Sequence, residues 1–241
     1  MFDHVGVSAS DRDASERFYD TVLETLGIEK DHSGEEYAEW DDFALGQATE
    51  ERPVTRGLHI GFVAPSRAHA DEFWRVGTAA GYRDDGAPGP RPEYGGNYYG
   101  AFLLDPDGNS AEAVHHGTLR QGGWIDHLWI RVADLAAAKR FYEAVAPYGG
   151  FHLNRDLAER AQFVGESGSF SVVRGTPAEH VHLAFPTSEN ATVDAFHRAL
   201  TEAGYRDNGA PGERLVYHPG YYAAFVLDPD GNNVEVVNHN R

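Results

Sequence analysis

The six residues LDPDGN occur twice in this chain, at 104–109 and at 227–232. The same offset of 123 residues (227 − 104 = 123) relates Gly81–Gly89 to Gly204–Gly212, with a single difference between the two stretches. A long period that occurs twice indicates two whole domains rather than a solenoid of small units.

The repeat extends over almost the whole chain. Asp3-His4 corresponds to Asp126-His127, and Phe18-Tyr19 corresponds to Phe141-Tyr142. We therefore predict one domain at 1–118 and a second domain at 124–241. The stretch 117–123 between them is polar and rich in glycine, which is typical of a linker.

Each copy shows strand and helix patterns in a fixed order that occurs twice within the copy. Apolar residues recur about every fourth position from Ala14 to Leu26, which predicts a helix, and Asp11 can cap its start. The stretch Gly86–Gly89 is expected to be a tight loop. The predicted elements of the first copy are strands at 2–8, between 37 and 47, and at 58–63, 98–104 and 110–116, and helices from about 12 to 26 and from 66 to 80. The sequence therefore predicts an α+β fold in which each copy has two β-α-β-β-β units.

Composition excludes several classes of protein. The formal net charge is −18 at pH 7, and such a charge repels nucleic acid and anionic membranes, so we expect neither as a partner. No apolar run approaches the roughly 20 residues that cross a bilayer. The start of the sequence lacks the pattern of a signal peptide, and cysteine is absent, so no thiolate can bind metal. We expect a cytoplasmic protein.

Three polar residues of each copy are predicted to share the inner face of a curved sheet. On the strand 58–63, His59 points away from the apolar residues Leu58 and Ile60, because side chains alternate along a strand. Glu112 on the last strand and His4 on the first strand are flanked by small residues that leave space. The corresponding residues of the second copy are His127, His182 and Glu235.

The order of elements, the His on the first strand, His59-Ile60-Gly61-Phe62 and the closing Asp-Pro-Asp-Gly-Asn-x-x-Glu resemble the vicinal oxygen chelate superfamily. That superfamily includes glyoxalase I, extradiol dioxygenases, methylmalonyl-CoA epimerase and antibiotic-resistance proteins of the bleomycin and fosfomycin type. The resemblance covers both copies. It implies two tandem glyoxalase-like domains, each a cup-shaped mixed sheet with helices outside. By position it also implies that the metal ligands are His4, His59, Glu112, His127, His182 and Glu235.

Two imidazoles and a carboxylate leave open positions on Fe(II), Mn(II), Ni(II) or Zn(II), so the expected cofactor is one of these divalent ions. A small substrate with two neighbouring oxygens could chelate there, with the metal as a Lewis acid or an oxygen-activating centre. The sequence leaves open whether each site forms within one copy or between the copies, and whether one site or both are active.

The sequence departs from glyoxalase I at the fourth metal ligand. That family uses a Glu or Gln on the last strand of the first unit, and only Asp41 or Asp42 is available here. The three-ligand set resembles the extradiol dioxygenases, whose acid–base histidine could correspond to His116, His180 or His218. No catalytic residue is predicted, and Tyr99, Tyr222 and His218 are proposed to bind substrate. Packing of the tyrosines on their strands is the alternative.

Three functions remain open from the sequence. The first is a metal-dependent dioxygenase, lyase or isomerase, motivated by the repeated ligand set. The second is a non-catalytic protein of the bleomycin-resistance kind that binds a small molecule, motivated by aromatic residues and acidic charge. The third is a scaffold whose ligand sets have lost their function. The duplication can supply both partners of a family dimer, so the chain is expected to be a monomer or a homodimer.

Overall fold

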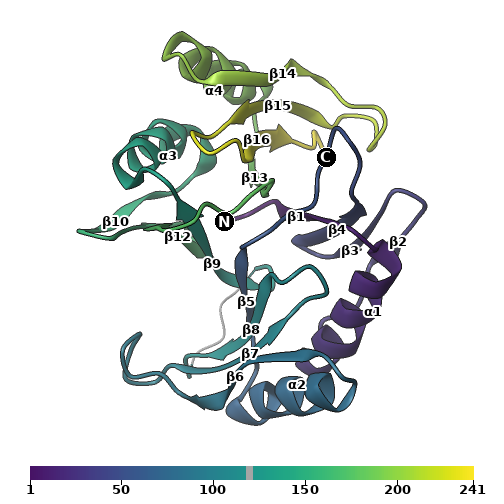
Figure 1. Ribbon diagram of the computed structural model, residues 1–241. Coiled ribbons are helices and arrows are strands. Elements are labelled where there is room, and N and C mark those ends of the chain that lie inside the picture. Colours follow the sequence, from purple (N-terminus) through teal and green to yellow (C-terminus); the bar gives the residue numbers. More distant parts are fainter. Residues whose placement is uncertain (118–121) are drawn as a thin grey trace. The chain divides into compact units, whose positions relative to one another are not determined.

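The computed structural model describes residues 1–117 and 122–241 (Figure 1). The linker predicted at 117–123 therefore lies partly outside the described residues. The chain forms two compact units. We call Gly6–Trp129 the N-terminal unit, and Met1–Val5 together with Ile130–Arg241 the C-terminal unit.

The order of elements confirms the predicted α+β fold with two β-α-β-β-β modules in each repeat. The elements of the first repeat are β1 (His4–Ala9), α1 (Arg12–Leu23), a 3-10 turn (Glu24–Leu26), β2 (His32–Ser33), β3 (Tyr37–Trp40), β4 (Phe43–Gln47), β5 (His59–Val63), α2 (Arg67–Ala79), β6 (Arg83–Pro90), β7 (Tyr99–Leu104) and β8 (Ser110–His115). Those of the second repeat are β9 (Ile125–Val132), α3 (Leu135–Gly149), β10 (His152–Leu157), β11 (Arg160–Val164), β12 (Ser169–Arg174), β13 (His182–Pro186), α4 (Asn190–Glu202), β14 (Arg206–Glu213), β15 (Tyr222–Leu227) and β16 (Asn233–Asn238).

Strand pairing gives each unit two groups of strands. The N-terminal unit contains β6-β7-β8-β5 with the start of β9 beside β5, and β2-β3-β4 with the end of β1 beside β4. The C-terminal unit contains β14-β15-β16-β13 with the start of β1 beside β13, and β10-β11-β12 with the end of β9 beside β12. The four-strand group of each unit is mixed, because β5 is parallel to β8 and β13 to β16, whereas β7 and β15 are antiparallel to β8 and β16.

The first strand of each repeat starts beside a strand of the other repeat. The start of β1 pairs with the second repeat, where the Asp3 N–H donates to the Ala184 carbonyl at 2.8 Å. Strand β9 runs antiparallel to β5 of the first repeat, with His127 opposite Gly61. Each compact unit therefore combines a first-strand histidine of one repeat with a group of four strands and a helix of the other.

The helices begin where the sequence indicates and pack on the strands. The Asp11 carboxylate caps α1 by accepting the Ala14 N–H, as predicted, and Asp134 caps α3 in the same way. Helix α2 packs against β6, β7 and β8, and α4 packs against β14, β15 and β16. No helix in the described part of the chain is long and apolar enough to span a membrane.

The expected loop at Gly86–Gly89 is wrong, because these residues lie in strand β6. The register of β6 against β7 shifts twice, between Asp84 and Gly86 and between Gly86 and Gly89. Gly86 has a φ of 155°, which favours glycine, and a β-carbon there would overlap the Phe102 ring. Bulges of this kind allow glycine and proline in a strand at the edge of a sheet. The composition of such a strand resembles that of a loop, so the sequence does not reveal the strand.

The turn LDPDGN is fastened to the first helix of its own repeat. Asp105 is 5% exposed, and its Oδ1 accepts the N–H groups of Asp107 and Asn109. Its Oδ2 accepts the Tyr19 hydroxyl at 3.0 Å. In the second repeat the Tyr142 hydroxyl donates to Asp228 at 3.2 Å. The repeated motif thus fixes the connection between the last two strands of each repeat. The last strand carries Glu112 in the first repeat and Glu235 in the second.

We expect Tyr19→Phe to lower the free energy of unfolding by about 1–2 kcal/mol, because a buried carboxylate oxygen loses a hydrogen-bond donor. Tyr99→Phe is the matched control, since the Tyr99 hydroxyl bonds Asp71 at the exposed surface. Urea unfolding of both variants measures the difference. Equal stability of the two variants would show that the buried bond contributes nothing.

Candidate metal centres

Each unit contains one group of two histidines and a glutamate whose ligand atoms lie close together. We call His59, Glu112 and His127 the N-terminal trio, and His4, His182 and Glu235 the C-terminal trio. In the N-terminal trio, Glu112 Oε2 lies 3.0 Å from His59 Nε2 and 3.3 Å from His127 Nε2, and the two nitrogens are 3.3 Å apart. In the C-terminal trio, His182 Nε2 lies 3.0 Å from both Glu235 Oε2 and His4 Nε2, and His4 Nε2 lies 3.8 Å from Glu235 Oε2.

Strand register brings the N-terminal trio together. Strands β5 and β8 are parallel, and Gly61 lies opposite Glu112 on one side and His127 on the other. A β-carbon at Gly61 would overlap the His127 ring, and one at Gly100 would overlap the Glu112 carboxylate. Glycine at these two positions therefore provides the space that the ring and the carboxylate fill.

The glutamates are buried, whereas the histidines reach solvent. Glu112 and Glu235 are each 1% exposed. The histidine side chains are 10–24% exposed, with His127 at the low end and His182 at the high end. A cation held here would thus have the carboxylate behind it and accessible positions in front.

The ionisation of Glu112 and that of His127 depend on each other. Burial raises the pKa of the Glu112 carboxyl, but hydrogen bonds with His127 and His59 outweigh burial and bring it to about 2. Burial lowers the pKa of the His127 imidazole, but hydrogen bonds with Asp126 and Glu112 raise it to about 9. A buried carboxylate therefore has a positive charge beside it, which a proton on His127 supplies at neutral pH.

The spacing of the ligand atoms fits a divalent ion. Ligands about 2.1 Å from a first-row ion and roughly 90–109° apart lie about 3.0–3.4 Å from one another. All three separations of the N-terminal trio fall in this range, as do two of the three in the C-terminal trio. The donor set of two nitrogens and one oxygen suits Fe(II), Mn(II), Ni(II) or Zn(II).

Second partners orient the ligands in both trios. The Nδ1 atoms of His127 and His4 lie 2.9 Å from Asp126 and Asp3, the residues that precede them. A carboxylate at Nδ1 holds the tautomer that presents Nε2 to a metal. The Oε1 atoms of Glu112 and Glu235 accept the hydroxyls of Tyr98 and Tyr221 at 2.7 and 2.6 Å. Burial and the neighbouring carboxylates raise the pKa of both tyrosines, so they remain donors.

The structure gathers all six predicted ligands, but each trio mixes the two repeats. His4 joins His182 and Glu235, and His127 joins His59 and Glu112. The cause is the pairing at the start of β1 and of β9, because the first-strand histidine of each repeat lies beside strands of the other. The question that the sequence left open is thus answered in favour of sites built from both repeats.

The predicted substrate-binding tyrosines do not reach the trios. The Tyr99 hydroxyl donates to Asp71 on α2, and the Tyr222 hydroxyl donates to Asp194 on α4. Their neighbours Tyr98 and Tyr221 contact the glutamates instead. Successive side chains of a strand point to opposite faces of the sheet. Tyr99 and Tyr222 therefore face the helices, whereas the residues before them face the glutamates.

His218 is connected to the C-terminal trio through two further residues. Its Nε2 lies 2.8 Å from His239 Nδ1, and His239 Nε2 lies 2.8 Å from Asp3, which bonds His4. In the N-terminal unit, His116 bonds Asp126 at 3.0 Å and occupies the place of His239. His180 precedes β13 in left-handed backbone and belongs to neither trio.

Asp41 and Asp42 also lie outside the trios. Asp42 is 6% exposed and accepts the N–H groups of Trp124 and Ile125, so it anchors the start of β9. Sequence reasoning missed this role and those of Asp3, Asp126 and His239. The repeated Asp-His dipeptide was the available signal for the two aspartates, since a carboxylate beside a histidine is a common outer partner of a metal ligand.

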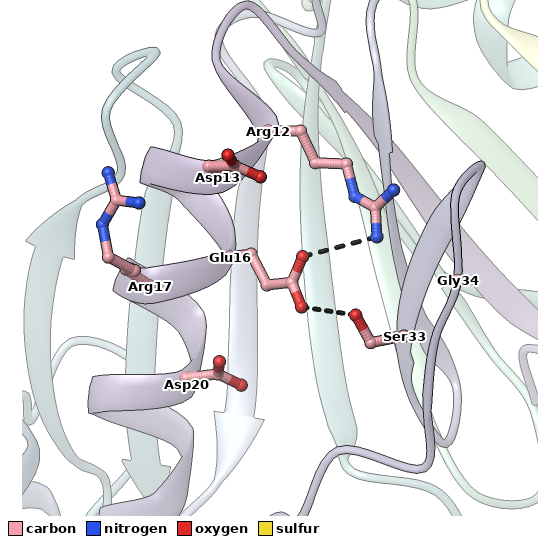
Figure 2. Close-up of a pocket in the computed structure, with 7 residues that line it drawn as sticks. All are labelled: Arg12, Asp13, Glu16, Arg17, Asp20, Ser33 and Gly34. Atoms are coloured by element: carbon pink, nitrogen blue, oxygen red, sulfur yellow. Dashed lines mark hydrogen bonds and ion pairs between the residues drawn. The ribbon is translucent and has the colours of Figure 1, made fainter.

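Two surface hollows share no residue with the trios. One, of ≈ 400 Å³, lies between α1 and β2, where Glu16 accepts hydrogen bonds from Arg12 and Ser33 (Figure 2). The other, of ≈ 440 Å³, lies along the LDPDGN turn of the first repeat. Polar groups of the first hollow bond one another, and Lys30 joins Glu16 to Asp20 beside it.

Comparisons with known proteins agree with the fold. Glyoxalase I from Zea mays is 19% identical, with a TM-score of 0.71 over 99% of this chain and 92% of that chain. A glyoxalase/bleomycin resistance protein from Albidiferax ferrireducens T118 is 28% identical over 47% of this chain and 96% of that chain, with a TM-score of 0.41. Curated proteins give no match.

The family model that matches is described as the Glyoxalase/Bleomycin resistance protein/Dioxygenase superfamily, and it matches twice, at residues 1–113 and 124–236. Together the two matches cover nearly the whole chain and coincide with the two repeats. The chain is a tandem two-domain protein that belongs to the glyoxalase/bleomycin resistance protein/dioxygenase superfamily.

Proposed function

We propose that this protein is a divalent-metal-dependent enzyme that acts on a small substrate with two neighbouring oxygens, as a dioxygenase, lyase or isomerase. The observation that carries the proposal is the convergence of two imidazole nitrogens and one buried carboxylate oxygen, which occurs once in each unit. Burial of a carboxylate is costly unless partners compensate for it, and in each unit two imidazoles lie beside the buried carboxylate.

The six trio residues would hold two metal ions, three ligands to each. A bound ion would supply Lewis-acid chemistry to a chelated substrate or, in the case of iron, oxygen activation. The histidine rings, which are partly exposed, leave the solvent side of each trio accessible to a substrate. Three protein ligands also leave coordination positions free, as catalytic rather than structural sites require.

The chain's own residues prepare these positions. The hydroxyls of Tyr98 and Tyr221 each donate a hydrogen bond to Oε1 of one glutamate, so the other oxygen, Oε2, is left for the cation. Asp126 and Asp3 accept from the Nδ1 atoms of His127 and His4 and thereby keep the ligand nitrogens facing inward. In the C-terminal unit the chain from Asp3 through His239 to His218 offers groups that can exchange protons near the site.

We expect the purified protein, after treatment with chelator and reconstitution, to bind two divalent ions per chain. Elemental analysis after gel filtration measures the ratio. His59→Ala and His182→Ala should each lose one ion, and the double variant should lose both, because each trio loses a nitrogen ligand.

His197→Ala is the control for removal of a histidine, since His197 pairs with Asp207 at the surface outside both trios. It should retain two ions. A double variant that binds as much metal as the wild-type protein would refute the metal sites.

Turnover separates the enzyme from a binding protein. Catechols and α-hydroxy ketones are suitable probes because each presents two neighbouring oxygens. We expect chelator to abolish turnover and the added ion to restore it. Tight binding of a probe that is insensitive to chelator, without turnover, would instead indicate the sequestering function.

Metal binding to the N-terminal trio should depend on pH through His127. A metal must displace the proton from this imidazole, whose pKa is raised to about 9. Below pH 9 the apparent affinity for the metal should therefore fall about tenfold for each unit by which the pH is lowered, since one proton competes with the ion. Glu112, with a pKa lowered to about 2, remains ionised throughout. Ni(II) titration of His182→Ala between pH 6.5 and 8.5 tests this, and an affinity that is constant over the range would contradict it.

A further inference from the structure

The two trios have the same ligands but different outer partners. The offset of 123 residues relates Ser110 to Asn233 and Asp85 to Asn208. Asp85 and Asn208 form the single difference between the two copies of the stretch at 81–89. Both pairs of residues bond the Nδ1 atom of a ligand histidine, directly or through one neighbour.

In the N-terminal unit the direction of these hydrogen bonds is fixed by charge. The Ser110 hydroxyl donates to Asp85 Oδ2 at 2.7 Å, and an ionised carboxylate can only accept. Ser110 Oγ is then left to accept from His59 Nδ1, which lies 3.0 Å away. With its proton on Nδ1, His59 has a free lone pair on Nε2, the atom that faces Glu112. This is the tautomer that a metal requires.

In the C-terminal unit the same chain of contacts runs the other way. Asn208 Nδ2 donates to Asn233 Oδ1 at 2.9 Å, and Asn233 Nδ2 lies 2.7 Å from His182 Nδ1. An amide nitrogen donates, so His182 Nδ1 accepts and its proton resides on Nε2, the ligand atom. Both amides must turn over before His182 can bind a metal, and neither carries a charge that favours the turned state.

Net charge around the trios points in the same direction. The N-terminal trio has the carboxylates of Asp126 and Asp85 within two hydrogen bonds of its histidines. In the C-terminal trio the carboxylate of Asp3 corresponds to that of Asp126, and the neutral amide of Asn208 corresponds to the carboxylate of Asp85. A divalent cation is therefore stabilised more by the surroundings of the N-terminal trio.

We propose that the two metal centres are inequivalent, with the N-terminal trio as the high-affinity site and Asp85, acting through Ser110 on His59, as the positioning residue that makes it so. The inference rests on the proposed metal binding. It assigns the first equivalent of metal to the unit that contains His59, Glu112 and His127. The C-terminal trio, with its chain to His218, then fills at higher metal concentration.

A reciprocal exchange of Asp85 and Asn208 tests the proposal. Calorimetric titration with Ni(II) at constant pH is performed on His182→Ala, which leaves the N-terminal trio intact, and on His59→Ala, which leaves the C-terminal trio intact. We expect the N-terminal trio to bind at least tenfold more tightly. Asp85→Asn added to His182→Ala should weaken binding about tenfold, as loss of an outer partner does. Asn208→Asp added to His59→Ala should strengthen binding.

Glu51→Gln, added to His182→Ala, is the control for the loss of one negative charge, because Glu51 lies exposed outside the trio in the same unit. Asp85→Glu should restore tight binding, and circular dichroism checks the folding of each variant. Equal affinity of the two trios, tighter binding by the C-terminal trio, or an Asp85→Asn effect no larger than that of Glu51→Gln would overturn the inference while metal binding stands. Absence of Ni(II) binding in every variant would overturn both the inference and the proposed function.

Discussion

A buried carboxylate between two imidazole rings is the constraint on which both sites of this protein depend. Glu112 and Glu235 are 1% exposed, and a carboxylate that is removed from water costs several kcal/mol unless a positive charge and hydrogen bonds replace the solvent. The neighbouring structure meets this demand in the same way twice. A tyrosine hydroxyl satisfies one oxygen, and two histidines face the other. In the N-terminal unit, Gly61 and Gly100 on adjacent strands leave the space for them. A cation, whether a proton or a metal ion, completes the charge balance.

The pairing of each first strand with a strand of the other repeat makes this arrangement possible. Each repeat contains all three kinds of ligand, yet the strand order places its first-strand histidine beside the other repeat. Duplication within one chain therefore supplies what a site of this kind needs from a second copy. A hydrogen bond from Asp3 to Ala184 holds the chain next to His4. Asp42 anchors the start of β9 close to His127.

Duplication also allows the two sites to diverge while their ligands stay the same. The differences lie one contact further out, where a serine and an aspartate of one unit correspond to two asparagines of the other. Because one superfamily fold hosts many chemistries, such outer contacts, more than the fold, decide which ion is bound and how tightly. His218, which bonds His239, is a second difference of this kind, because the corresponding residue of the N-terminal unit is Gly95.

The sequence by itself determined the tandem repeat, the order of strands and helices and the LDPDGN turn, because each of these depends on local periodicity or on the offset of 123 residues. The resemblance to the superfamily named the six residues that the structure gathers into the two trios. It did not determine the phase of the strand that follows Tyr98, so Tyr99 was chosen where Tyr98 contacts the glutamate, and it did not reveal β6, whose glycines and prolines mark an edge strand with bulges. Only the tertiary structure decided which histidine meets which glutamate. That choice depends on pairing between strands more than 50 residues apart in sequence, as in His59 and His127, and local patterns carry no information about such partners.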